Sequence, residues 1–185
     1  MKPTAIVLAC LGGEMSALGV VRSLGREGIP VIVVSEGSDK ELEASHFITK
    51  FIIEPDYLAK PEYGIRILSN IAQQESKRPA IIPTADPDAL FVGRYRDQLG
   101  EYFNVISPPH DLVETLLDKG AFDQLAKQYD FPVPRTEEPK NLSELKAIAD
   151  DLQYPVVMKP KLTSSGGSEA ILEIVDHKKS LRVDS

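Results

Sequence analysis

The chain has 185 residues, of which 42% are hydrophobic and 26% charged, and its formal net charge is −7. This length suits one domain, or one domain and part of another, with an apolar core that needs no crosslinks. The negative charge argues against a nucleic-acid partner or an anionic membrane surface. Cys10 is the only cysteine, so no disulfide forms within the chain, and we expect a reducing, cytoplasmic setting.

The first part of the chain alternates apolar runs with segments of helical periodicity. Buried strands are predicted at 4–10, 30–35, 50–54, 79–84 and 103–107. Helices are predicted between them at 15–27, 62–75 and 86–100. Strands that alternate with helices in this way indicate an α/β fold with a doubly wound, parallel, Rossmann-like sheet.

The pattern changes after Pro109. Helical character follows over 110–130 with a break near Gly120, and three prolines mark a connector at 131–140. Beyond it we expect a helix from Asn141 with Glu144 in a capping box. Strands at 155–160 and 169–175, the loop 161–167 between them and a final helix after Asp176 would complete this part.

These changes predict a division into three parts. Residues 1–110 form the Rossmann-like domain, 111–135 a helical connector, and 136–185 a small and incomplete α+β subdomain.

A glycine turn lies between the first strand and the first helix. Gly12 and Gly13 would expose backbone N–H groups at a positive helix end, which suits an anion, or they simply make the turn. The spacing is not G-x-G-x-x-G, although Glu36 stands where a nicotinamide-cofactor protein places its ribose-binding acid. Gly19 is expected to let the helix pack closely.

Two carboxylates follow the strand at 79–84. Asp86 is predicted to cap the next helix, with Pro87 at its first position. Asp88 would lie in the first turn, where the helix dipole favours negative charge. Neither has a visible partner for acid–base chemistry, so no catalytic residue is assigned.

Two lysines lie in segments that could hold an anion. Lys119 stands near the predicted helix break, and Lys159 ends an apolar strand before the loop "TSSGG". A lysine beside hydroxyls and free N–H groups suits a phosphate, whereas the alternatives are a solvated lysine and a plain hairpin loop. The three histidines are scattered without metal-like spacing, and no metal ligand is assigned.

The two lysine segments, in this order, resemble the ATP-grasp superfamily. They are "DKGAFDQLAKQYDFPVPRT" and "YPVVMKPKLTSSGG". The segment "PAIIPTADPDAL" looks like its counterpart in carbamoyl-phosphate synthetase-like members, and "LGGEMSALGVVRSL" is similar to the first turn of D-aspartate ligases. The resemblance covers essentially the whole chain.

The resemblance implies a carboxylate–amine ligase that uses ATP to activate a small carboxylate or amino acid as an acyl phosphate for attack by an amine. Lys119 and Lys159 would bind the ATP phosphates. The lid over them would comprise Ser164, Ser165, Gly166 and Gly167. The residues facing the substrate would be Gly12, Gly13, Glu14 and Asp86.

Family members place their magnesium ligands far downstream of these motifs, in a second half of the grasp. The chain therefore resembles the N-terminal, pre-ATP-grasp portion followed by a truncated first grasp subdomain. We expect it to be inactive alone, with magnesium supplied by the missing half of the parent protein.

Two alternatives remain open at this point. The glycine turn and Glu36 would suit an NAD(P)-binding oxidoreductase domain. The chain would otherwise be a non-catalytic ligand-binding or oligomerisation module, since a half-grasp leaves apolar surface uncovered and could form a homodimer.

Overall fold

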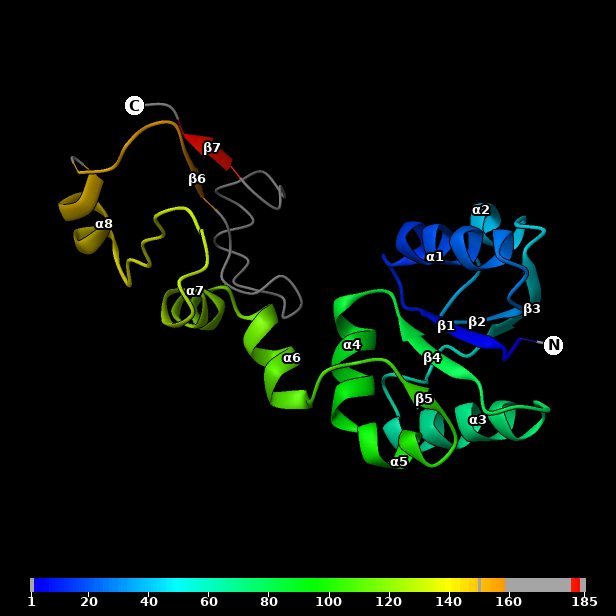
Figure 1. Cartoon of the computed structure of the whole chain (residues 1–185). Coiled ribbons are helices and arrows are strands. Elements are labelled where there is room, and N and C mark those ends of the chain that lie inside the picture. The colour runs from blue at the N-terminus through cyan, green and yellow to red at the C-terminus, as the bar shows by residue number, and fades with distance from the viewer. Residues whose placement is uncertain (1, 150, 159–180, 184–185) are drawn as a thin grey trace. The chain divides into compact units, whose positions relative to one another are not determined.

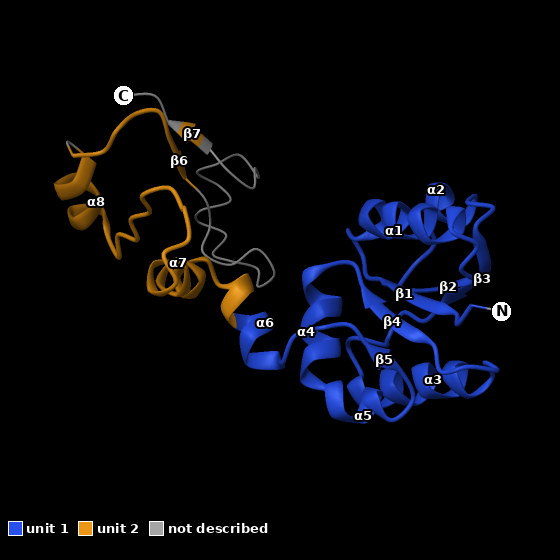
Figure 2. Ribbon diagram, in the orientation of Figure 1, with its two compact units in different colours: residues 1–114 blue, residues 115–185 orange. Residues whose placement is uncertain are grey.

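The computed structural model describes residues 2–149, 151–158 and 181–183. The chain divides into two compact units, Met1–Glu114 and Thr115–Ser185 (Figure 2).

Unit 1 is built on a five-stranded parallel sheet. Its strands lie in the spatial order β3-β2-β1-β4-β5, and every neighbouring pair is parallel. Their bounds are Ala5–Ala9 for β1, Val31–Ser35 for β2, Ile48–Ile53 for β3, Ala80–Pro83 for β4 and Asn104–Val105 for β5. The predicted doubly wound α/β sheet is confirmed.

Helices cover both faces of this sheet (Figure 1). One face carries α1 (Glu14–Arg26) and α2 (Lys40–Glu43). The other carries α3 (Pro61–Gln73), α4 (Asp86–Arg94) and α5 (Arg96–Gly100).

The central strand β1 has no exposed side. Ile6 and Leu8 pack toward α3, α4 and α5, whereas Val7 and Ala9 pack toward α1. All four side chains are fully buried. Burial on both faces explains why this strand appears in the sequence as a continuous apolar run rather than an alternating one.

Three details of unit 1 differ from the sequence-based expectation. The helix predicted over 86–100 is interrupted at Tyr95, whose φ of −105° and ψ of 24° end α4 before α5 begins. Helix α2 was not predicted, because four residues are too few to show a period. The prediction that Gly19 allows close packing of the helix is wrong, since nothing lies within 4 Å of a Cβ placed there.

The described residues of unit 2 include helices and a two-stranded antiparallel sheet. Helix α6 (His110–Leu117) contains the boundary between the units, and α7 (Lys119–Gln128) and α8 (Leu142–Ala149) follow it. Strand β6 (Val156–Met158) pairs antiparallel with β7 (Leu181–Val183). Within the described residues, no helix combines the length and apolar character needed to cross a membrane.

The local signals of unit 2 are confirmed in part. The side-chain oxygen Oδ1 of Asn141 accepts the Glu144 N–H at 2.9 Å, as the predicted capping box requires. The Glu144 carboxylate accepts the N–H of Lys140, one residue before the cap, at 2.8 Å. The break predicted near Gly120 lies at Asp118, whose carboxylate caps α7 by accepting the Ala121 N–H. The helix expected after Asp176 is wrong over 181–183, which form β7. The predicted strand at 169–175 and the loop 161–167 lie outside the described residues.

Two of the helical glycines, Gly64 in α3 and Gly19 in α1, predict opposite effects on stability. A Cβ at Gly64 would meet the Tyr57 carbonyl oxygen at 2.1 Å, so Gly64→Ala must shift backbone and should lower the free energy of unfolding by about 1–3 kcal/mol. Gly19→Ala, in an open position of α1, should raise it by about 0.5–1 kcal/mol. Urea unfolding of both variants measures the difference. Equal effects would contradict the packing of Tyr57 on α3.

Candidate functional site

The strand order reverses next to β1, and this reversal locates the candidate site. The chain runs outward from β1 to β2 and β3, then returns to place β4 on the other side of β1. Open parallel sheets bind ligands in the crevice outside the carboxyl ends of the two strands at such a reversal. The segments that leave β1 and β4 there are Cys10–Gly13 and Thr84–Asp86.

The glycine turn after β1 packs directly on the turn after β4. Gly12 has a φ of 85°, a conformation that favours glycine. A Cβ on Gly13 would lie 2.9 Å from the Ala85 Cβ and 3.2 Å from the Cys10 carbonyl oxygen. The Thr84 hydroxyl donates to the Leu8 carbonyl at 2.7 Å and so joins the two strand ends. Both glycines therefore have a structural reason to be glycine.

Carboxylates already accept the outward N–H groups of this turn. The Leu11 N–H donates to Glu36 at 3.0 Å, and the Gly12 N–H donates to Glu14 at 3.1 Å. Glu36 comes from the end of β2 and Glu14 from the first turn of α1. A phosphate that approached this turn would meet two negative charges in place of free N–H donors.

The rim of the crevice is acidic and partly apolar. Asp86, the first residue of α4, adds a third carboxylate to Glu14 and Glu36. Leu11 and Met15 are 70% and 77% exposed beside them. The structure thus places the turns that carry Gly12, Gly13, Glu14 and Asp86 at the same edge of the sheet.

The cap prediction for Asp86 is wrong by one residue. Ala85 occupies the N-cap position in extended conformation, and no side chain caps α4. Asp86 is already helical and Pro87 follows inside the first turn, so the Asp86 carboxylate interacts with the helix dipole rather than with a cap N–H.

Asp88 departs most from its sequence-based prediction, which assigned it only a favourable place in the first turn of the helix. Its side chain is completely buried, although no partner was visible in the sequence. One carboxylate oxygen accepts the Cys10 N–H at 3.3 Å, and the other accepts the hydroxyl of Tyr57 from the β3–α3 loop. Tyr57 is itself fully buried and meets Phe91 edge-on. Only the fold could reveal this contact, because Tyr57 and Asp88 are far apart in the sequence.

Burial governs the protonation of these groups. It raises the pKa of Asp88 above its ordinary value, although the donors Tyr57 and Cys10 oppose the shift. Burial also raises the pKa of the Cys10 thiol to about 12, helped by the negative charge of Asp88. The pKa of Tyr57 is raised for the same reasons. Cys10 is therefore a core thiol rather than a nucleophile.

The residues predicted to bind ATP belong to unit 2. Lys119 is the first residue of α7, directly after the capping residue Asp118. Lys159, Ser164, Ser165, Gly166 and Gly167 lie outside the described residues. Among the residues that the structure describes, no group of three histidine, cysteine or acidic side chains could hold a metal ion.

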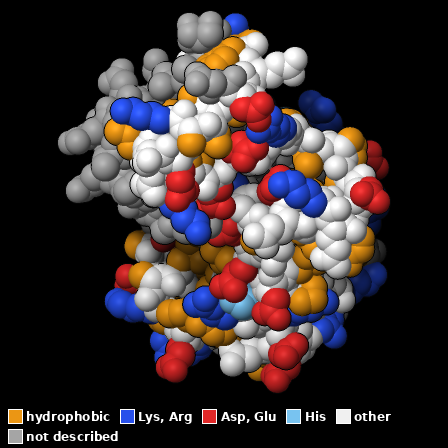
Figure 3. All heavy atoms as spheres, turned by 90° about the vertical axis from the view of Figure 1, so that its left-hand side faces the viewer, with side chains coloured by type: hydrophobic (Ala, Val, Ile, Leu, Met, Phe, Trp, Pro, Cys, Tyr) orange, Lys and Arg blue, Asp and Glu red, His pale blue; other side chains and the backbone are white. Residues whose placement is uncertain are grey.

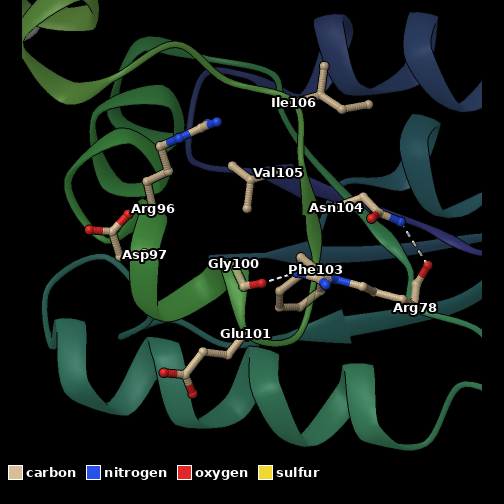
Figure 4. Close-up of a pocket in the computed structure, with 9 residues that line it drawn as sticks. All are labelled: Arg78, Arg96, Asp97, Gly100, Glu101, Phe103, Asn104, Val105 and Ile106. Atoms are coloured by element: carbon tan, nitrogen blue, oxygen red, sulfur yellow. Dashed lines mark hydrogen bonds between the residues drawn. The ribbon is translucent and has the colours of Figure 1, made fainter.

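A pocket of about 570 Å³ flanks the edge strand β5 and contains none of the predicted site residues (Figure 4). Its two arginines are held by structural contacts: Arg78 donates to the Gly100 carbonyl and Arg96 to the Ser107 carbonyl. Asp97 and Glu101 also line it. Because its cations are engaged and its rim carries carboxylates, we do not assign ligand binding to this pocket.

The surface charge of the described residues bears on the expectation that the chain has no nucleic-acid or anionic membrane partner. On the face shown in Figure 3, acidic and basic side chains are interspersed, and the described residues form no broad basic field there. This distribution agrees with the net charge of −7.

Comparisons with known proteins bear on the family. No family model matches the chain. It is 26% identical over 158 residues to D-aspartate ligase of Enterococcus faecium, which covers 81% of this chain and 37% of that protein. It is 26% identical over 156 residues to the carbamoyl phosphate synthase large chain of Methanothermobacter thermautotrophicus, covering 83% of this chain and 14% of that protein. The resemblance to ATP-grasp ligases is confirmed.

The fold comparison agrees with the sequence relatives. The crystal structure of L-amino acid ligase from Bacillus licheniformis superposes with a TM-score of 0.59 at 15% identity, over 100% of this chain and 40% of that chain. At this identity the likeness is one of fold, and it agrees with the Rossmann-like parallel sheet of unit 1. The chain spans well under half the length of these ATP-grasp relatives.

The buried carboxyl of Asp88 predicts a specific pH dependence. Since its pKa is raised by burial, the folded chain holds this proton more tightly than the unfolded chain does. Its contribution to the free energy of unfolding is therefore complete below the ordinary pKa of 3.8 and declines as the pH rises above it. Asp88→Asn removes this titration, so the stability of the original chain relative to the variant should fall as the pH rises above about 4. Urea unfolding across that range measures the difference, and a constant difference would contradict the raised pKa.

Proposed function

We propose that this chain provides the N-terminal part of an ATP-dependent ligase, which activates a small carboxylate as an acyl phosphate for attack by an amine. The observation that supports the proposal is that the turn after β1, which carries Gly12 and Gly13, packs on the turn after β4, while Glu14 and Asp86 begin the helices that follow. Its relatives supply the reaction class, since D-aspartate ligase and L-amino acid ligase join carboxylates to amines.

The crevice of unit 1 would hold an amine-bearing substrate. Glu14 and Glu36 accept the turn N–H groups that would otherwise attract an anion, and Asp86 begins α4 directly after the neighbouring turn. An ammonium group gains Coulomb energy at this edge, whereas a phosphate or pyrophosphate loses it. The same argument disfavours the nicotinamide alternative, because Glu36 is engaged with the turn that a pyrophosphate would need.

The ATP phosphates would instead meet the lysines of unit 2. Lys119 stands at the positive end of the α7 dipole, where a bound anion would be stabilised. Lys159 and the segment 164–167 would complete the phosphate contacts. Bound ATP would supply the phosphoryl group that activates the carboxylate, and magnesium would be held by other parts of the parent protein.

A non-catalytic ligand-binding or oligomerisation module is the second candidate. Leu11 and Met15 are largely exposed at the crevice, and exposed apolar side chains favour association. Light scattering over a range of chain concentrations tests the homodimer that this candidate predicts. A constant monomer mass would remove the homodimer and leave only the ligand-binding form of this candidate.

The amine preference is testable with a matched pair of ligands. D-aspartate should bind the chain in calorimetry, and succinate, which lacks the amine, should bind at least fivefold more weakly. Asp86→Asn should weaken D-aspartate binding about fivefold, whereas Asp97→Asn, an equal change of charge at the exposed end of α5, should leave it unchanged. Tight NADH binding without a response to D-aspartate or ATP would favour the oxidoreductase instead.

The phosphate role of Lys119 is testable on a single helix. Lys119→Met should weaken ATP binding at least tenfold, the effect of losing one hydrogen bond to a charged group. Lys127→Met is the control, because Lys127 lies in the last turn of α7, at the negative end of the helix dipole, where it pairs with Asp123 at 2.6 Å. Calorimetry with ATP measures both variants. Equal affinities for the two would exclude Lys119 from the nucleotide site.

A further inference from the structure

Three loops at the carboxyl edge of the sheet meet at one buried carboxylate. Asp88 belongs to α4, directly after β4, and its oxygens accept donors from the end of β1 and from the β3–α3 loop. The residues that donate, Cys10 and Tyr57, are 1% and 0% exposed. The contact is thus sealed from water beneath the crevice rather than open to a ligand.

The hydrogen bond between Asp88 and the Cys10 N–H fixes the backbone at the start of the glycine turn. The Cys10 carbonyl accepts the Gly13 N–H at 2.9 Å and so closes the turn, while the Cys10 N–H points to Asp88 at 3.3 Å. Cys10 therefore connects Asp88 to the backbone that carries Gly12 and Gly13. Without the carboxylate, the Cys10 N–H would be a buried donor with no acceptor, which is costly.

The bond to Tyr57 fixes the second loop. Tyr57 lies against Phe91 of α4 with ring centroids 6.1 Å apart at 88°, and its carbonyl approaches α3 at Gly64. These contacts hold the ring, and the hydroxyl then reaches Asp88. The β3–α3 loop is tied in this way to the same point as the glycine turn.

We propose that Asp88 is a positioning residue, which holds the glycine turn and the β3–α3 loop in one fixed arrangement around the crevice. It does not touch the substrate. It acts through Cys10 on the turn that carries the predicted substrate contacts, and through Tyr57 on the neighbouring loop. This positioning role rests on the proposed function only for the measurement of ligand affinity, because hydrogen exchange needs no ligand.

Three variants separate the two bonds. Asp88→Ala removes both acceptors. Asp88→Asn keeps the shape, since its amide oxygen can face the Cys10 N–H while its NH₂ group donates to a rotated Tyr57 hydroxyl. Tyr57→Phe removes only the link to the loop. Ser69→Ala is the matched control, because Ser69 is 7% exposed in α3 and its hydroxyl has no partner among the described residues.

The primary readout is amide hydrogen exchange by NMR, corrected for global stability, which needs no ligand. Asp88→Ala should speed exchange at Cys10 and Gly13 at least tenfold, and Asp88→Asn should restore it to within about threefold of the original chain. Tyr57→Phe should speed exchange at Tyr57 and Lys60 at least tenfold while Gly13 keeps its rate. Ser69→Ala should change none of these. If Asp88→Ala does not fold, the Tyr57→Phe and Asp88→Asn results decide.

The second readout is the affinity for D-aspartate. It should fall at least tenfold in Asp88→Ala and recover in Asp88→Asn. Unchanged exchange at Cys10 and Gly13 in Asp88→Ala, or at Tyr57 and Lys60 in Tyr57→Phe, would overturn the positioning role. Altered exchange in a chain that binds no D-aspartate would instead uphold the positioning role and overturn the proposed ligand, so the two failures are distinguishable.

Discussion

The parallel pairing of β1 with both β2 and β4 is the constraint on which unit 1 depends. Ala5 to Ala9 align with Val31 to Ser35 on one side, and Ala5 to Leu8 align with Ala80 to Pro83 on the other. A strand paired on both edges and covered on both faces must be apolar throughout. The same pairing brings the carboxyl ends of β1, β2 and β4 to one edge of the sheet. The turns that follow these strands therefore lie together at the candidate site.

The polar groups at that edge are arranged in two layers. Glu14 and Glu36 accept N–H groups at the rim, where water can solvate their remaining oxygens. Asp88 lies beneath them without solvent, and its donors must replace water completely. The rim therefore sets the charge that a ligand meets, while the buried layer sets the geometry of the backbone. The proposed preference for an amine-bearing ligand rests on the rim alone.

Unit 2 depends on local interactions to a greater extent. Asp118 and Asn141 each cap the helix that follows them, and the two-stranded sheet joins only short segments. Helix α8 has no buried residue among those described. This unit carries Lys119 at the N-terminus of α7. In the proposed function, the acidic sheet edge of unit 1 binds the substrate and Lys119 of unit 2 binds ATP.

The sequence by itself determined the fold class, the strands of the sheet, the glycine turn and the resemblance to ATP-grasp ligases. These follow from apolar runs, helical periods and contiguous motifs, which are properties of neighbours along the chain. Only the tertiary structure decided that Asp88 is buried against Tyr57 and Cys10, that Glu36 accepts the Leu11 N–H, and that Gly13 rather than Gly19 is packed closely. Each of these depends on segments separated by 25 or more residues. Such segments meet only because the parallel sheet brings the ends of its strands to one edge.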